Sequence, residues 1–358
     1  PPPPPPPMSC RRQRQMCIRD RSLIARLFLS HFIAVLCVGL AVADDALFAA
    51  DEVLEVVLTG PVAKTVRDKR APGEREFRIA IGDFDWPVEV RTRGKSRLQY
   101  CSFPPLRLNF DEDEVTSGPF AGLDKVKLVT QCSDSSRSSD NLLEEYAAYR
   151  MLNEVTALSH RARLLRIRYV DSEKPKRQPA VQYAFAIEPL ENVALRNGVE
   201  ALALEHLVAS RVNRQQAALV FVFEYLIANI DWSLVRGDGA DECCHNMKVL
   251  TADREQLLIP YDFDLSGLVN ARYADRLPNM RKRSVRDRQY MGYCLGGLDL
   301  ETALAEFVAR KGRIMAVLDG LDWIQEKEVR KRVKFLEAFF DEAAAGLAEQ
   351  MTKDCVGG

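Results

Sequence analysis

The chain has 358 residues, with 50 Lys and Arg against 51 Asp and Glu and a formal net charge of −1. Hydrophobic residues make up 47% of the sequence, which excludes a wholly disordered chain and is enough for one large domain or two modest ones. The near-neutral charge argues against a dedicated nucleic-acid-binding protein, because such proteins usually carry a basic excess.

Two N-terminal segments are expected to lie outside the fold. Residues 1–21 begin with seven prolines and continue into a basic stretch that resembles translated adapter sequence, so we interpret them as an assembly artefact without structure. Residues 22–43 contain Arg26, an apolar run at 32–42 and small residues up to Ala43, which are the three regions of a secretory signal peptide. The apolar run is short for a bilayer span, which favours cleavage over a membrane anchor.

Cleavage after Ala43 would remove six Arg and one Asp and leave 315 residues with a net charge of −6. We expect this chain to be secreted or periplasmic, with no nucleic-acid partner and no stable membrane insertion. An even number of cysteines follows the cleavage site, and an exported chain permits disulfides between them. They are Cys101, Cys132, Cys243, Cys244, Cys294 and Cys355.

The positions of the cysteines suggest two pairings. Cys101 precedes one predicted strand and Cys132 follows another, so these two pair if the strands are neighbours. Cys294 is expected to reach Cys243 or Cys244, which as sequence neighbours rarely bond to each other. The spacing of these cysteines does not match that of a tetrahedral zinc site.

Alternating apolar residues predict a β-rich first half, and a spacing of three and four residues predicts helices after Pro189. Expected strands cover residues 53–58, 76–81, 88–93, 105–110, 125–129, 164–170, 181–188, 247–250 and 257–260; a polar loop is expected at 133–140 and helices at 141–158, 199–209, 215–228 and 329–351. The expected fold is α+β with two lobes: a β-rich N-lobe at 44–189 and a catalytic C-lobe at 190–298, on which helices at 299–358 pack.

Residues 229–267 carry the clearest chemical pattern. Asp231 follows a predicted helix, Asn246 precedes a predicted hairpin, and Asp262 and Asp264 follow it with a spacing that puts both on one face of an extended segment. The first Asp can orient or deprotonate a hydroxyl, and the Asn and the later Asp residues can hold Mg²⁺ or Mn²⁺ against phosphate oxygens. This set predicts phosphoryl transfer.

Cationic groups for a phosphate lie earlier in the chain. Lys125 and Lys127 alternate with apolar residues on one strand face, and Glu145 lies on the next predicted helix. A strand lysine paired with a helix glutamate is the protein-kinase arrangement. Arg93 and Gly94 follow another strand, where the backbone can approach a phosphate or simply form a hairpin turn.

These motifs resemble, in their order, those of the CotH-type spore-coat kinases, an atypical branch of the protein kinases. The resemblance covers roughly residues 86–267. It rests on Arg93-Gly-Lys-Ser96, Gly122-Leu-Asp-Lys-Val-Lys-Leu128, Leu143-Glu-Glu-Tyr-Ala-Ala-Tyr149, Tyr183-Ala-Phe-Ala-Ile-Glu188, Asn229-Ile-Asp231, His245-Asn246 and Pro260-Tyr-Asp-Phe-Asp264.

The resemblance implies a two-lobed protein-kinase-like fold that binds ATP with Mg²⁺. It implies that Asp231 is the catalytic Asp, that Asn246 and Asp262 bind the metal, and that Lys125 binds phosphate with Glu145 as its partner. Three features depart from the pattern: a long insertion contains Asp238, Asp241 and Glu242, Lys127 competes with Lys125, and Asp264 stands where kinases have glycine.

Three functions follow from this pattern. The first is an exported kinase that transfers phosphoryl from ATP to a protein Ser or Thr. The second is a non-catalytic exported binding protein, similar to surface adhesins of the same family. The third is a metal-dependent hydrolase, which the lack of a His-rich ligand set disfavours. Because relatives of this fold also include AMP-transferring, glutamylating and inactive proteins, the motifs alone do not fix the reaction.

Overall fold

The chain is described from a computed structural model, which covers residues 46–71, 73–176, 178–204, 206–235, 237, 243–274, 280–321 and 324–357. The expected artefact at 1–21, the expected signal peptide at 22–43, and Asp238, Asp241 and Glu242 of the insertion lie outside these residues. By their contacts, the residues from Ala43 to Gly358 belong to one unit. No helix in the described part of the chain is both long and apolar enough to cross a membrane.

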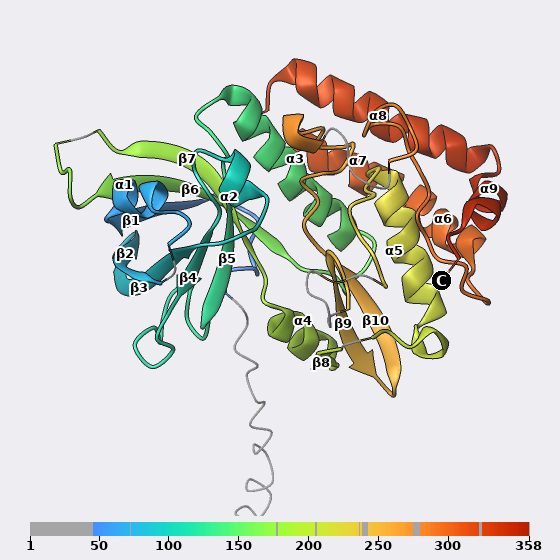
Figure 1. Cartoon of the computed structure of the whole chain (residues 1–358), viewed down its shortest axis with the longest axis horizontal. Coiled ribbons are helices and arrows are strands. Elements are labelled where there is room, and N and C mark those ends of the chain that lie inside the picture. The colour runs from blue at the N-terminus through green and yellow to red at the C-terminus, as the bar shows by residue number, and fades with distance from the viewer. Residues whose placement is uncertain are drawn as a thin grey trace, which may run out of the picture. The chain divides into compact units, whose positions relative to one another are not determined.

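In the described residues of the first half, seven strands close into a barrel (Figure 1). Around the barrel their order is β1-β2-β3-β4-β5-β7-β6, and β6 returns to pair with β1 in parallel, from Leu54 opposite Leu165 to Gly60 opposite Asp171. The strands are β1 Leu54–Gly60, β2 Arg75–Ile81, β3 Phe84–Thr92, β4 Leu106–Asn109, β5 Lys125–Thr130, β6 Ala162–Asp171 and β7 Ala180–Ile187.

The alternating pattern of the sequence fills this barrel. Successive side chains of a strand point to opposite faces, so every second residue faces the interior. The interior side chains include Leu58, Ile79, Val90, Leu108 and Val126, each at most 1% exposed. Two short helices, α1 Val62–Arg67 and α2 Arg97–Tyr100, lie in the connections between strands.

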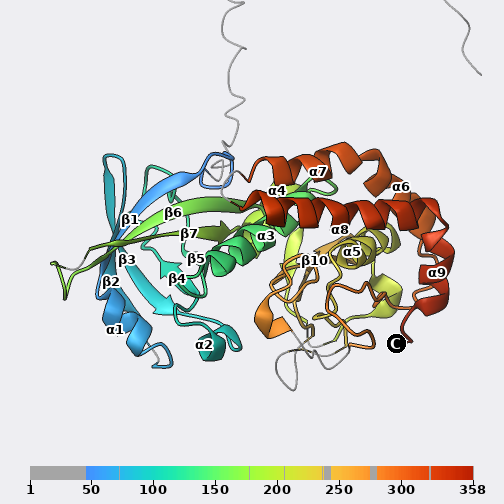
Figure 2. The same cartoon turned by 90° about the horizontal axis from the view of Figure 1, so that it is seen from above.

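Helix α3, Ser136–Asn153, connects β5 to β6 and lies between the barrel and the helical half (Figure 2). It packs against β6 and β7 and against α7 of the second half. The helix begins at Ser136 rather than at residue 141, because the side chain of Ser135 accepts a hydrogen bond from the N–H of Ser138 and caps the first turn. The predicted polar loop at 133–140 is therefore wrong beyond Ser135.

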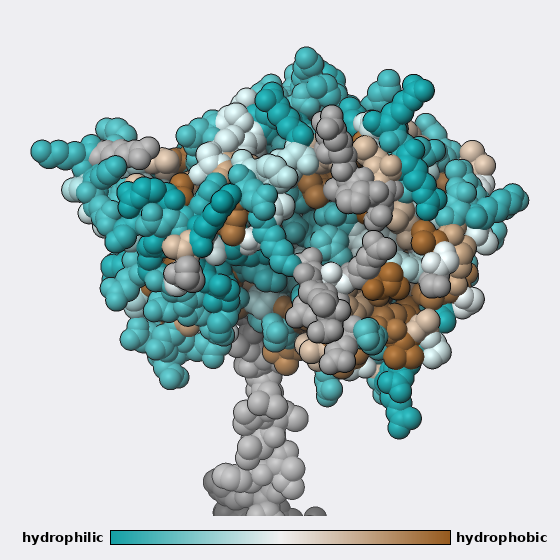
Figure 3. All heavy atoms as spheres, in the orientation of Figure 1, coloured by the Kyte–Doolittle hydropathy of each residue, from teal (hydrophilic) through white to brown (hydrophobic). Residues whose placement is uncertain are grey.

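The second half combines helices with a small sheet of strand order β10-β9-β8. Hydrophobic residues gather on this side of the face seen in Figure 1, whereas hydrophilic residues dominate over the barrel (Figure 3). The elements of the second half are α4 Leu190–Asn197, β8 Glu200–Leu202, η1 Ala209–Arg211, α5 Arg214–Leu226, β9 Met247–Ala252, β10 Glu255–Pro260, η2 Arg272–Ala274, α6 Leu300–Ala309, α7 Lys311–Asp319, α8 Glu326–Ala344 and α9 Leu347–Asp354.

The helix predicted at residues 199–209 is wrong. Gly198 adopts φ 65°, a left-handed conformation that ends α4 just before that segment. The chain then extends as β8, which pairs with β9 through Glu200 and Thr251. The C-terminal apolar stripe is confirmed as helical, but Gly346, at φ 92°, divides it into α8 and α9.

The α+β class predicted from the sequence is correct, but the two-lobed protein-kinase-like fold is wrong. The β-rich half is a closed mixed barrel rather than the open sheet of a typical kinase lobe. Alternation predicts where strands occur, but not which edges meet. Here the parallel pairing of β1 with β6 satisfies the backbone groups of two edges that an open sheet would leave free.

The described cysteines form three bonded pairs. The predicted bridge between Cys101 and Cys132 is confirmed, with Cα atoms 4.6 Å apart. The expected partner of Cys294 is wrong: it bonds Cys355, beside a short backbone bridge between Tyr293 and Val356. Cys243 and Cys244 bond each other, contrary to expectation.

Candidate functional site

Asp231 and Asn246 lie side by side although they are 15 positions apart in the chain. Asn246 Nδ2 donates to the carbonyl oxygen of Asp231 at 2.6 Å and to its carboxylate at 3.0 Å. The N–H of Asp231 in turn donates to Asn229 Oδ1 at 3.1 Å, and an isolated bridge joins Ser233 to His245. These contacts bring the two predicted residues together although the insertion separates them in the sequence.

His245 is a neighbour of Asp231 that the sequence prediction did not include among the site residues. Its Nε2 lies 3.2 Å from Oδ1 of Asp231, while Asn246 donates to Oδ2 of the same carboxylate. Contacts on both oxygens fix the orientation of the carboxylate, which is what a group that positions a hydroxyl requires. Its position directly before Asn246 was the one available signal in the sequence.

Asn246 and Asp262 leave the same end of the β9–β10 hairpin. Met247 pairs with Pro260 in its last register position, and the N–H of Tyr261 donates to the carbonyl of Asn246 at 3.2 Å. Both residues have positive φ angles, 50° for Asn246 and 65° for Asp262. Residues other than glycine seldom adopt this conformation, and such strained positions gather at functional sites.

The Asp262 side chain is 43% exposed and therefore accessible to a ligand. Its N–H donates to the hydroxyl of Tyr149 at 2.9 Å, which fixes the backbone of Asp262 against α3. Desolvation of the carboxylate by the protein around it, followed by the charge of Asp264, raises the pKa of Asp262 to about 6. The charge of Asp231 contributes in the same direction. Asp231 and Asp262 are thus near enough to affect each other electrostatically.

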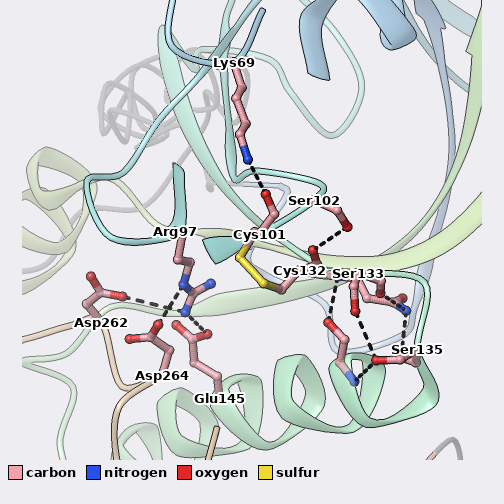
Figure 4. Close-up of a disulfide and its surroundings, with 12 residues drawn as sticks. Lys69, Arg97, Cys101, Ser102, Cys132, Ser133, Ser135, Glu145, Asp262 and Asp264 are labelled. Carbon is pink, nitrogen blue, oxygen red and sulfur yellow. Dashed lines mark hydrogen bonds and ion pairs between the residues drawn. A yellow bond between two sulfur atoms is a disulfide. The ribbon is translucent and has the colours of Figure 1, made fainter. Parts of the chain in front are cut away.

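Arg97, a buried arginine of the barrel half, forms ion pairs with the carboxylates that lie next to Asp262. Figure 4 shows Asp262, Asp264 and Glu145 arranged around the guanidinium of Arg97. Arg97 donates to Glu145 at 2.5 Å and to Asp264 at 2.8 Å, and it lies 3.9 Å from Asp262. Burial by itself lowers the pKa of Arg97. The negative charges of Asp264 and Glu145 outweigh this effect and hold the pKa well above its ordinary value.

The cluster changes the roles expected for Asp264 and Glu145. The side chain of Asp264 is only 6% exposed and its carboxylate is engaged by Arg97, a cation that would compete with a metal ion for this group. Glu145, 2% exposed, pairs with Arg97 rather than with a strand lysine. The sequence prediction missed Arg97, because no motif distinguishes it from the many other arginines of the chain.

The structure separates the two candidate lysines. Lys125 pairs with Asp124 and lines a cavity of about 640 Å³ on the barrel, next to acidic residues that include Glu112. Lys127 instead lies with its Nζ 5.5 Å from the ring centroid of Tyr261, immediately before Asp262. Of the two, Lys127 is the lysine at the Asp262 site.

Arg93 is near the same site, whereas Gly94 has no described contact with it. The positive charge of Arg93 lowers the pKa of Lys127 and opposes the rise in the pKa of Asp262. The N–H of Arg93 donates to the carbonyl of Pro105 at 2.9 Å, so this backbone group is not free for a phosphate. Gly94 has φ 93° and allows the turn from β3 into α2, which carries Arg97.

Asp262 and Asn246 are the groups that could hold a magnesium ion together with phosphate oxygens. Within the described residues, no three His, Cys, Asp or Glu side chains gather closely enough to form a metal site by themselves. Mg²⁺, however, commonly uses one or two carboxylates together with phosphate oxygens and water. Asp262 supplies an accessible carboxylate. Asn246 is 5% exposed and its amide nitrogen is engaged by Asp231, so Oδ1 is the atom through which its side chain could contact a cation.

No family model matches the chain, and no curated protein matches it. The resemblance to CotH-type kinases therefore stays a prediction, and the chemistry has to be inferred from the site itself.

Proposed function

We propose that this protein is a metal-dependent phosphotransferase that moves the terminal phosphoryl group of ATP to a Ser or Thr hydroxyl of a protein. The observation that carries the proposal is the convergence of Asp231, Asn246 and Asp262, from two loops, with Lys127 from the barrel. Phosphoryl transfer depends mainly on positioning and on charge stabilisation, and these side chains supply both.

Each residue has a separate role in this proposal. Asp231, held on both oxygens by His245 and Asn246, orients the acceptor hydroxyl and accepts its proton. Asp262 and Oδ1 of Asn246 would hold Mg²⁺ or Mn²⁺, which neutralises charge on the phosphate oxygens. Lys127, on β5 of the barrel, supplies a further positive charge.

Export of the protein is part of the proposal. The three cysteine pairs at bonding distance fit a compartment in which disulfides persist. Together with the leader expected at residues 22–43, they support a secreted or periplasmic location, where the acceptor would be another exported protein.

The test is calorimetric titration of the purified chain with a non-hydrolysable ATP analogue, with and without Mg²⁺, followed by a transfer assay on exported proteins. Asp262→Asn should abolish the Mg²⁺-dependent part of binding. Asp231→Ala should preserve binding but lower transfer by about 10²–10⁴-fold, since it removes the group that positions the hydroxyl.

Asp253→Asn is the matched control for Asp262→Asn. Asp253 lies at the other end of the same hairpin, is exposed and also has a positive φ, 47° against 65°. Asn tolerates this conformation at both positions, so backbone strain cannot explain a difference between the two variants. Absence of Mg²⁺-dependent nucleotide binding in the unmodified chain would refute the proposal.

A non-catalytic exported binding protein is the second candidate, and one observation favours it. Glu145 is taken by Arg97, so the lysine–glutamate pair of active protein kinases is not formed. If neither nucleotide nor metal binds, this candidate replaces the phosphotransferase.

A further inference from the structure

Two lysines from different strands meet at one aromatic ring. The Nζ of Lys127, on β5 of the barrel, lies 5.5 Å from the ring centroid of Tyr261, and the Nζ of Lys248, on β9, lies 5.7 Å from the same centroid. Both fall within the range in which an ammonium group interacts with an aromatic ring. Tyr261 directly precedes Asp262, so the two ammonium groups are adjacent to the proposed metal site.

Positive charge at this ring is not balanced by ion pairs. In the part of the chain that the structure describes, none of Arg93, Lys127 and Lys248 forms an ion pair with an acidic side chain. Asp262 and Glu191 affect the pKa of Lys127 more weakly than Arg93 and Lys248 do. The chain as a whole has slightly more acidic than basic residues, so this gathering of cations is local.

Like charges held together in partly buried surroundings destabilise one another, and an anionic ligand relieves this cost. Burial, followed by Arg93 and Lys248, lowers the pKa of Lys127 to about 8, which agrees with such crowding. Lysine ammonium groups bind phosphate as point charges, and a chain of phosphates can contact several of them at once.

We propose that Lys248 and Lys127 form a polyphosphate-binding site around Tyr261. This inference rests on the proposed phosphotransferase function and adds how the donor is held: the site takes a ligand with at least two linked phosphates, as in a nucleoside di- or triphosphate, rather than a monophosphate. Lys248 contacts a phosphate different from the one that Lys127 contacts.

The test is titration of the full chain with inorganic tripolyphosphate and, separately, with orthophosphate, without metal and at low salt. Lys248→Met should weaken tripolyphosphate binding by about tenfold or more, because a charged hydrogen bond is lost, and should change orthophosphate binding little. The substitution should weaken ATP binding as it weakens tripolyphosphate binding, and it should change AMP binding as little as orthophosphate binding. Unchanged ATP affinity in Lys248→Met would overturn the assignment of the site to the donor.

Lys125→Met is the matched control, since Lys125 is an exposed lysine on the same strand face as Lys127 but paired with Asp124. It should leave tripolyphosphate affinity unchanged. Equal losses in Lys125→Met and Lys248→Met would indicate non-specific attraction and overturn the inference, as would the absence of tripolyphosphate binding. Because Lys248 is exposed, the Lys248→Met variant should have the same melting temperature as the unmodified chain.

The two proposals fail in different ways. Polyphosphate binding that depends on Lys248, without any phosphoryl transfer, would refute the phosphotransferase and support the binding site. Transfer that proceeds unchanged in Lys248→Met, with unchanged tripolyphosphate affinity, would refute the binding site and support the enzyme.

Discussion

Arg97 and Glu145 form a buried ion pair that joins the barrel to helix α3. The guanidinium donates to the carboxylate at 2.5 Å, and the two side chains are 9% and 2% exposed. Arg97 also donates to Asp264 at 2.8 Å. Arg97 therefore bonds two buried carboxyl groups next to Asp262, and in doing so it fixes the segment that follows β10.

Arg97→Met should destabilise the protein strongly. The substitution leaves Glu145 and Asp264 buried without a counter-charge, and removal of one partner from a buried ion pair typically costs about 3–5 kcal/mol. The free energy of unfolding, measured by urea titration, should fall by that amount.

Arg78→Met is the control for this loss of charge. Arg78 pairs with Asp85 on the barrel surface, where both side chains are more than half exposed. Exposed pairs contribute about 0–1 kcal/mol, so this variant should unfold with nearly unchanged free energy. Similar losses of unfolding free energy in both variants would show that the buried ion pairs of Arg97 contribute no more to stability than an exposed pair does.

The disulfide between Cys101 and Cys132 should add substantially to stability. Cys101 directly follows α2, which carries Arg97, and Cys132 lies just before the Ser135 cap of α3 (Figure 4). The bridge closes a loop with a sequence separation of 31, for which chain entropy predicts about 3–4 kcal/mol.

The double variant Cys101→Ala, Cys132→Ala tests this contribution by urea unfolding without reductant. Adding reductant should destabilise the unmodified chain further than it destabilises the variant, because only the former still has this bridge to lose. A difference in free energy below about 1 kcal/mol between the two oxidised proteins would contradict the expectation.

Local patterns in the sequence predicted individual elements better than their assembly. Alternating residues located β2 within a residue or two, and spacing located α5. Closure of the barrel depends on the pairing of Leu54 with Leu165, which neither segment encodes alone. A single residue, Gly198, decided between helix and strand for the segment after it.

The candidate site shows the same division. Asp231, Asn246 and Asp262 could be selected because their residue types and order are informative without coordinates. Arg97 could not, because its partners Glu145 and Asp264 lie 48 and 167 positions away. Lys125 and Lys127 share a strand face, so only the approach of Tyr261 from the second half distinguishes them.

Binding of polyphosphate should weaken as pH rises above about 8. Burial, followed by Arg93 and Lys248, lowers the pKa of Lys127 from its ordinary 10.5 to about 8, and the weaker influences of Asp262 and Glu191 oppose the shift. A bound anion favours the charged form, so it raises this pKa and the complex takes up a proton between about pH 8 and 10. Affinity should therefore fall by up to about tenfold per pH unit in this window.

Lys127→Arg separates this titration from other effects of pH. Arginine stays protonated throughout the window, so tripolyphosphate affinity in the variant should vary little between pH 7 and pH 9.5, whereas that of the unmodified chain should decline. Titration in buffers of different ionisation enthalpy should show proton uptake near pH 8.5 in the unmodified chain and little in Lys127→Arg. Equal pH dependence in both proteins would mean that another group titrates, and that Lys127 is not the residue that senses the bound phosphate.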